Sequence, residues 1–150
     1  MPRLSLESPL GRVTVFADDA AITALVWGDK SSGPASPLLQ EAKHQILAYF
    51  AGKRRDFDLP LRAEGTDDEQ RIWTVMAQIP YGETRSYGWI AQQLDLNARE
   101  IGQACGRNPI PILLPCHRVV AANGELHGYS GKGGIETKRH LLQLEGALLI

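Results

Sequence analysis

Residues 86–106, SYGWIAQQLDLNAREIGQACG, carry the pattern of two short helices joined by a tight turn. The first helix is predicted from about Ser86 to Leu94, because its apolar residues recur at helical spacing. The turn is Asp95-Leu96-Asn97, and Asn97 with a Glu three positions later is a typical start for the second helix, which reaches Gly106. Two such helices in tandem resemble a helix-turn-helix, although any helical hairpin has the same pattern.

Another helix precedes this pair. In Thr66-Asp67-Asp68-Glu69, the Thr hydroxyl and the Glu carboxylate can each satisfy a backbone amide of the first turn, which is a capping box. Pro80 ends this helix, whose apolar stripe comprises Ile72, Val75, Met76 and Ile79. We place a domain boundary near 62–66, which gives domains of residues 1–65 and 66–150.

The first domain is predicted to be a small antiparallel sheet with one helix on it. Residues 3–28 alternate between apolar and polar positions around two turns, as a hairpin or meander does. The helix is expected from about Pro37 to Ala51, capped by Ser36 and stopped by Gly52. Residues 57–61 alternate again, which indicates a short strand or an extended arm.

Composition excludes several classes of protein. The chain has 150 residues, a net charge of −1 and no apolar run long enough to cross a membrane. Two Cys and four scattered His form no zinc pattern, and no loop has the order of a phosphate-binding motif, so we expect neither a metal nor a cofactor. These features predict a cytoplasmic protein without a membrane partner. We also expect it to be a monomer.

An apolar run, residues 110–114, leads into Pro115-Cys116-His117-Arg118-Val119. A thiol beside an imidazole can act as a nucleophile, because the imidazole can take its proton and the thiolate is the reactive form. We therefore expect the pKa of Cys116 to lie below that of an ordinary thiol. A buried structural Cys is the alternative, and it is how we interpret Cys105. The last helix is expected from Ile135 to Glu145.

These stretches together resemble the O6-alkylguanine-DNA alkyltransferase family, also called methylated-DNA–protein-cysteine methyltransferases. The resemblance covers most of the chain and is strongest from Ile79 to Gly146. The motifs that carry it are Ile79-Pro80-Tyr81-Gly82-Glu83-Thr84, Ser86-Tyr87-Gly88, Ala98-Arg99, Ile101-Gly102, Asn108-Pro109, Pro115-Cys116-His117-Arg118-Val119, Gly128-Tyr129-Ser130-Gly131, Lys138, Leu141-Leu142 and Glu145-Gly146.

The resemblance implies an α+β fold: a ribonuclease H-like sheet-and-helix domain, then a mainly helical, winged helix-turn-helix-like domain. It also implies a single-turnover transfer of the alkyl group from guanine O6 to Cys116. His117 would remove the thiol proton, Glu145 would orient the imidazole, Tyr87 would donate a proton toward the guanine, and Asn108 would organise the neighbouring turn.

The implied partner is double-stranded DNA containing O6-alkylguanine, with O4-alkylthymine as a second candidate substrate. The damaged nucleotide would be flipped out of the duplex. Arg99 would fill the space it leaves, on a recognition helix lying in the minor groove. Further DNA contacts would come from Ser86, Ala98 and Gly102, and the base pocket would be lined by Pro111, Val119, Tyr129 and Ser130.

The chain departs from the family pattern in two places. Asp68-Glu69 stands where the family usually has an apolar aromatic residue and a Gln, and the loop between Gly131 and Lys138 is two residues longer than in many members. The zinc-binding residues of some eukaryotic relatives have no counterparts. Two other functions are compatible with parts of the sequence: a damage-binding module that uses only the helix-turn-helix, and a Cys-His hydrolase. Retention of Cys116 counts against the first, and the missing oxyanion motif counts against the second.

Overall fold

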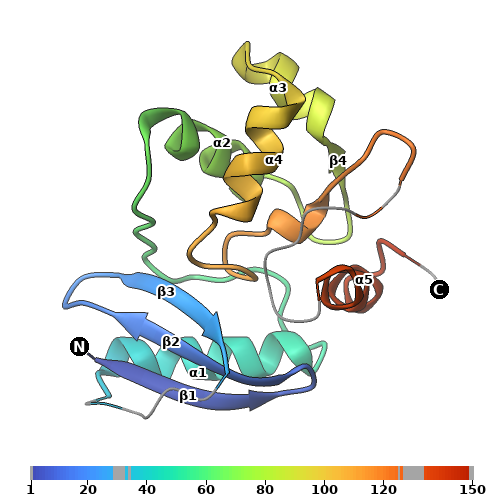
Figure 1. The fold of residues 1–150 in the computed structure, drawn as a ribbon. Helices are drawn as coiled ribbons and strands as arrows, with labels where there is room; N and C mark the ends of the chain where they lie inside the picture. Colours follow the sequence, from blue (N-terminus) through green and yellow to red (C-terminus); the bar gives the residue numbers. More distant parts are fainter. Residues whose placement is uncertain (1, 29–32, 34, 125, 127–133, 149–150) are drawn as a thin grey trace. The chain divides into compact units, whose positions relative to one another are not determined.

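The structure is a computed structural model that describes residues 2–28, 33, 35–124, 126 and 134–148. The chain divides into two compact units, Met1–Glu64 and Gly65–Ile150 (Figure 1). The predicted fold class is confirmed: a small antiparallel sheet with a helix is followed by a mainly helical unit.

The first unit consists of β1 (Arg3–Ser8), β2 (Gly11–Ala17), β3 (Ile22–Trp27) and α1 (Pro37–Phe50). The strands are antiparallel in the order β1-β2-β3, and α1 packs against β1 and β2 along one face of the sheet (Figure 1). The Ser36 hydroxyl caps α1 by accepting a hydrogen bond from the Leu39 amide, as predicted. The apolar core between sheet and helix contains Leu4, Leu6, Val13, Val15, Leu25, Leu39, Ile46 and Tyr49.

Residues 57–61 form an extended arm rather than a regular strand. A single bridge joins Ile22 and Leu61, where the Ile22 amide donates to Pro60 O at 2.8 Å. The buried Gln45 side chain of α1 also holds the arm, since it both donates to Asp58 O and accepts from the Asp58 amide. The alternating pattern therefore indicated extended backbone correctly.

The second unit contains α2 (Asp67–Ala77), β4 (Arg85–Ser86), α3 (Tyr87–Leu94), α4 (Ala98–Gly106), the 3₁₀ turn η1 (Cys116–Arg118), β5 (Val119–Val120) and α5 (Ile135–Leu144). Both predicted capping boxes are present, at Thr66 and Asn97. Asp95 makes the turn between α3 and α4 with a left-handed φ of 57°, a conformation that Asp tolerates better than most residues.

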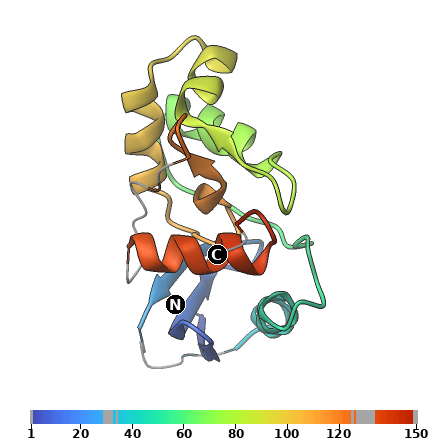
Figure 2. The same cartoon turned by 90° about the vertical axis from the view of Figure 1, so that its right-hand side faces the viewer.

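Two short parallel strands lie between these helices. β4 pairs with β5, so Arg85 stands opposite Val119 and Ser86 opposite Val120. Figure 2 shows α5, in red, lying beside η1, which immediately precedes β5. The pairing brings the start of α3 next to the end of η1, and hence Tyr87 close to the Cys-His segment. Two-residue strands are too short to show any periodicity, so the sequence did not predict them.

Candidate active site

The Asn108 side chain fixes the loop that leads to Cys116. Its Oδ1 accepts from the Ile110 amide at 2.9 Å, and its Nδ2 donates to Leu114 O at 2.9 Å. Between these anchors, Ile112 has a left-handed φ of 75°, which is strained for a β-branched residue and reverses the chain. The Cys116 amide also donates to Leu114 O, and the bond from the Arg118 amide to Pro115 O at 3.0 Å then starts η1. Asn108 therefore organises the turn, and Cys116 itself is buried.

His117 and Glu145 form a buried pair. The imidazole Nε2 lies 2.7 Å from Glu145 Oε2, and neither side chain is exposed to solvent. Because a carboxylate accepts hydrogen bonds, this contact places the imidazole proton on Nε2 and leaves Nδ1 as the basic nitrogen. Nδ1 is buried and has no hydrogen-bond partner, a property that it shares only with Trp27 Nε1 among the side chains described.

Arg118 is a further member of this cluster. Its Nε donates to Glu145 Oε1 at 2.8 Å, and one terminal nitrogen donates to Glu145 Oε2 at 3.0 Å. Glu145 sits at the C-terminal end of α5, where the helix dipole disfavours a negative charge, and the guanidinium offsets that effect. Although Arg118 lies within the recognisable motif, sequence reasoning gave it no role; a charged residue within an apolar stretch was the available signal.

The environment sets the charge state of each group. Burial raises the pKa of Cys116, and this outweighs a hydrogen bond from Asn108 and the charge of Lys138. Burial also lowers the pKa of His117, against the influence of Glu145. Burial alone would raise the pKa of Glu145, but His117 and Arg118 prevail and lower it to about 2. At neutral pH the resting site therefore holds a thiol, a neutral imidazole and a carboxylate, so the expectation of a depressed Cys116 pKa was wrong.

The half-buried Tyr87 and the buried Lys138 form a second contact. Lys138 Nζ donates to Val119 O at 2.6 Å and to the Tyr87 hydroxyl at 3.3 Å, and it lies 5.6 Å from the Tyr87 ring centroid. Burial raises the pKa of Tyr87, so its phenol stays protonated and can donate. Burial likewise lowers the pKa of Lys138, which occupies an inward position of α5. A Lys among the apolar positions of that helix was a signal that sequence reasoning left unused.

The predicted DNA-contact residues lie on one side of α4 and at the start of α3. Ala98 and Arg99 are exposed and Gly102 is half-buried, whereas Ile101, Ala104 and Cys105 form the buried face. The Ser86 hydroxyl accepts from the Trp89 amide at 2.9 Å and so caps α3. Pro111 and Val119, predicted to line the base pocket, are buried. Tyr129 and Ser130, their predicted neighbours, lie outside the described residues.

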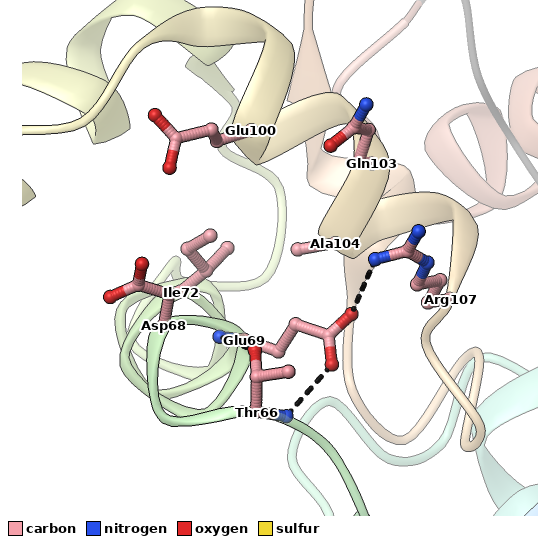
Figure 3. Close-up of a pocket in the computed structure, with 8 residues that line it drawn as sticks. All are labelled: Thr66, Asp68, Glu69, Ile72, Glu100, Gln103, Ala104 and Arg107. Carbon is pink, nitrogen blue, oxygen red and sulfur yellow. Dashed lines mark hydrogen bonds and ion pairs between the residues drawn. The ribbon is translucent and has the colours of Figure 1, made fainter.

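A hollow of about 150 Å³ lies between the start of α2 and a different side of α4 (Figure 3). Glu69 closes the capping box by accepting from the Thr66 amide at 2.9 Å, and its other oxygen pairs with Arg107 at 3.3 Å. Glu69 thus links α2 to α4. It belongs to the pair Asp68-Glu69, which departs from the family pattern, and this link gives that departure a structural role. The carboxylates of Asp68 and Glu100 line the same hollow and would repel DNA phosphates.

Comparison with known proteins identifies the family. Residues 3–63 match the ribonuclease-like domain of 6-O-methylguanine DNA methyltransferase, and residues 67–147 match the DNA binding domain of the same protein. The chain belongs to the 6-O-methylguanine DNA methyltransferase family. As a member, it is a transferase that binds DNA and repairs it by alkyl transfer.

Individual relatives agree with this assignment. The chain is 43% identical to the methylated-DNA–protein-cysteine methyltransferase of Mycobacterium tuberculosis, over 94% of this chain and 90% of the relative. It is 40% identical to the constitutive enzyme of Bacillus subtilis, over 93% of this chain and 92% of the relative. The crystal structure of Mycobacterium tuberculosis OGT in complex with DNA matches with a TM-score of 0.87 and 43% identity, covering 98% of this chain and 94% of that one.

The described residues contain neither a cluster suited to a metal ion nor a helix suited to crossing a membrane. No three His, Cys, Asp or Glu side chains within those residues gather in a way that could hold a metal ion. None of the helices in the described part of the chain has the length and apolar character to cross a membrane.

Proposed function

We propose that this chain repairs O6-alkylguanine in double-stranded DNA by moving the alkyl group irreversibly to Cys116. The observation that supports this most strongly is the buried Cys116-His117-Glu145 arrangement, in which the carboxylate fixes the imidazole tautomer and leaves Nδ1 free to accept a proton. This is the nucleophile, base and orienting group that activation of a thiol requires.

The transfer is a displacement at the alkyl carbon. The thiol proton passes to His117 Nδ1 through a bridging water, the Cys116 sulfur bonds to the carbon, and the carbon–O6 bond breaks. The electron pair of that bond stays on the guanine, which receives a proton from Tyr87. The positive charge of Lys138, 3.3 Å from the phenol oxygen, stabilises the phenolate that this proton transfer leaves. Because burial makes the Tyr87 phenol a weak acid, it releases its proton only to the developing guanine anion.

The side of α4 that carries Arg99 is suited to close contact with DNA. The helical period places Ala98, Gly102 and Gly106 on this side, whereas Glu100 and Arg107 face the acidic hollow (Figure 3). A Cβ added at Gly102 or Gly106 would meet no atom within 4 Å. Since glycine destabilises a helix and the fold leaves room for a side chain, the absence of side chains here favours close approach of the minor groove.

Arg99 stands exposed in the first turn of this helix and occupies the duplex position that the flipped nucleotide vacates. The extruded base then enters a pocket bounded by Pro111 and Val119, with Tyr129 and Ser130 as its other proposed contacts. O4-alkylthymine is a second candidate substrate. Because the net charge is −1, phosphate contacts depend on local groups, and we expect modest affinity. We expect the protein to act as a monomer in the cytoplasm.

The function is tested by titrating duplex DNA that contains O6-methylguanine against a fixed amount of protein and counting the repaired guanines. We expect repair to stop at one guanine per chain, because a thioether on Cys116 is not hydrolysed by water. Cys116→Ser should abolish repair, since a hydroxyl is far less ionised than a thiol, whereas Cys105→Ala serves as the matched control and should keep it. Repair well beyond one equivalent, or repair by Cys116→Ser, would contradict the proposal.

A further inference from the structure

Arg118 is a buried cation that contacts Glu145 and the turn at Ile79–Gly82. Besides its two bonds to Glu145, its remaining terminal nitrogen donates to Ile79 O at 2.7 Å, and its guanidinium carbon lies 5.8 Å from the Tyr81 ring centroid. The side chain is about 8% exposed. A permanently charged guanidinium is costly to bury unless its donors are satisfied, so this geometry must contribute something beyond packing.

The turn at Ile79–Gly82 holds both Arg118 and the end of α5. The Tyr81 hydroxyl donates to Leu144 O at 3.2 Å, while the Tyr81 ring lies against the guanidinium. Gly82 has a φ of 84°, and a Cβ at this position would lie only 3.2 Å from Glu145 O. The turn therefore fixes the backbone around Glu145, and Arg118 fixes its carboxylate.

The charges around His117 explain why it is useful for Arg118 to hold the Glu145 carboxylate. A carboxylate 2.7 Å from an imidazole favours the imidazolium, and an imidazolium cannot accept the thiol proton. The charged groups that act on His117 are Glu145, Arg118 and Lys138. Burial already disfavours the imidazolium, and the positive guanidinium of Arg118 offsets part of the opposing influence of the carboxylate. His117 therefore keeps an orienting partner without being driven into its charged form.

We propose that Arg118, held by the Ile79–Gly82 turn, is a positioning residue for the general base: it orients Glu145 and keeps His117 neutral, with Nδ1 ready to accept a proton. The inference rests on the proposed function, because it takes His117 to be the base for Cys116. It adds a fourth residue to the Cys-His-Glu arrangement, and this residue acts through Glu145 without touching the substrate.

The test compares wild type with Arg118→Gln and with the double variant Arg118→Gln/Glu145→Gln. The protonation of the His117 imidazole is followed by NMR as a function of pH, and the single-turnover rate of methyl transfer from an O6-methylguanine duplex is measured over the same range. In Arg118→Gln the Glu145 carboxylate has lost its counter-charge. The midpoint of the His117 titration should therefore move upward by about one pH unit or more. The acid limb of the rate profile should move with it, so that the rate at a given pH on that limb should fall about tenfold.

The double variant removes the negative charge as well, so its His117 titration should return toward the wild-type position. Arg139→Gln is the matched control, because Arg139 pairs at 2.7 Å with Glu136 on the exposed part of α5, and it should leave the titration unchanged. Arg118→Lys keeps the positive charge but loses the planar guanidinium that donates two hydrogen bonds to Glu145. This variant should keep the wild-type His117 titration but transfer the methyl group more slowly.

An unchanged His117 titration in Arg118→Gln, or a displaced one that the double variant does not restore, would overturn the inference. If Arg118→Gln does not fold, Arg118→Lys decides, and a wild-type rate in that variant would overturn it. Failure of the proposed function has a different signature: wild type would transfer no methyl group, whereas the NMR titrations would still report the influence of Arg118 on His117.

Discussion

Replacement of Glu145 by Gln should destabilise the protein in a way that depends on pH. In wild type the carboxylate accepts bonds from His117 and from two nitrogens of Arg118. Gln can still accept from His117, but it leaves a buried guanidinium without a counter-charge. Breaking a buried ion pair in this manner costs about 3–5 kcal/mol at neutral pH.

The pH dependence follows from the pKa of Glu145, which folding lowers from 4.5 to about 2. A carboxyl group with a depressed folded-state pKa stabilises the protein above its unfolded pKa, and this stabilisation is lost as the pH falls toward the folded value. A shift of this size corresponds to about 3 kcal/mol at neutral pH and to only about 1 kcal/mol at pH 3. The stability difference between wild type and Glu145→Gln should therefore shrink by about 2 kcal/mol between pH 7 and pH 3.

Urea unfolding of both proteins at a series of pH values measures this difference. Glu136→Gln is the control on the same helix, because Glu136 pairs with Arg139 at an exposed site, and it should change stability by no more than about 0.5 kcal/mol at any pH. A difference between wild type and Glu145→Gln that stays constant from pH 7 to pH 3 would refute the reasoning, as would a cost below about 1 kcal/mol at pH 7.

Three further predictions concern α4 and the thiol. Arg99→Ala should reduce repair of duplex DNA by about tenfold or more but spare reaction with free O6-alkylguanine base, because only the duplex requires nucleotide flipping; equal losses in the two rate assays would remove Arg99 from this role. Gly102→Ala should raise stability by about 0.5–1 kcal/mol in urea unfolding and yet weaken DNA binding in an anisotropy titration, whereas unchanged affinity would mean that DNA does not approach this face. Iodoacetamide should label Cys116 slowly at neutral pH, because burial raises its pKa; rapid labelling in a mass-spectrometric time course would show that the thiolate is already present.

The parts of the fold that the sequence could predict are those with local signals. The capping boxes at Thr66 and Asn97 involve residues three positions apart, so both helix starts follow from nearby residues. The same is true of Ser36 at the start of α1. The pairing of β4 with β5 joins residues more than thirty positions apart over two pairs, and no local pattern carries that information.

The candidate site also has some features with local sequence signals and others that depend on the folded chain. The motif around Cys116 predicts the nucleophile and its neighbour, but the pKa of a thiol depends on how deeply the folded chain buries it. We expected His117 to lower that pKa, whereas burial raises it. Arg118 and Lys138 were visible in the sequence, yet their partners Ile79 and Tyr87 lie far away along the chain. Only the tertiary structure joins them.

The central claim is that Cys116 accepts the alkyl group and keeps it. Intact-protein mass spectrometry after incubation with excess O6-methylguanine duplex, followed by peptide mapping, tests it most directly. We expect each chain to gain one methyl group in place of one hydrogen, located on Cys116, and to retain it on prolonged incubation. A chain of unchanged mass, a methyl group on another residue, or a modification that disappears with time would contradict the account.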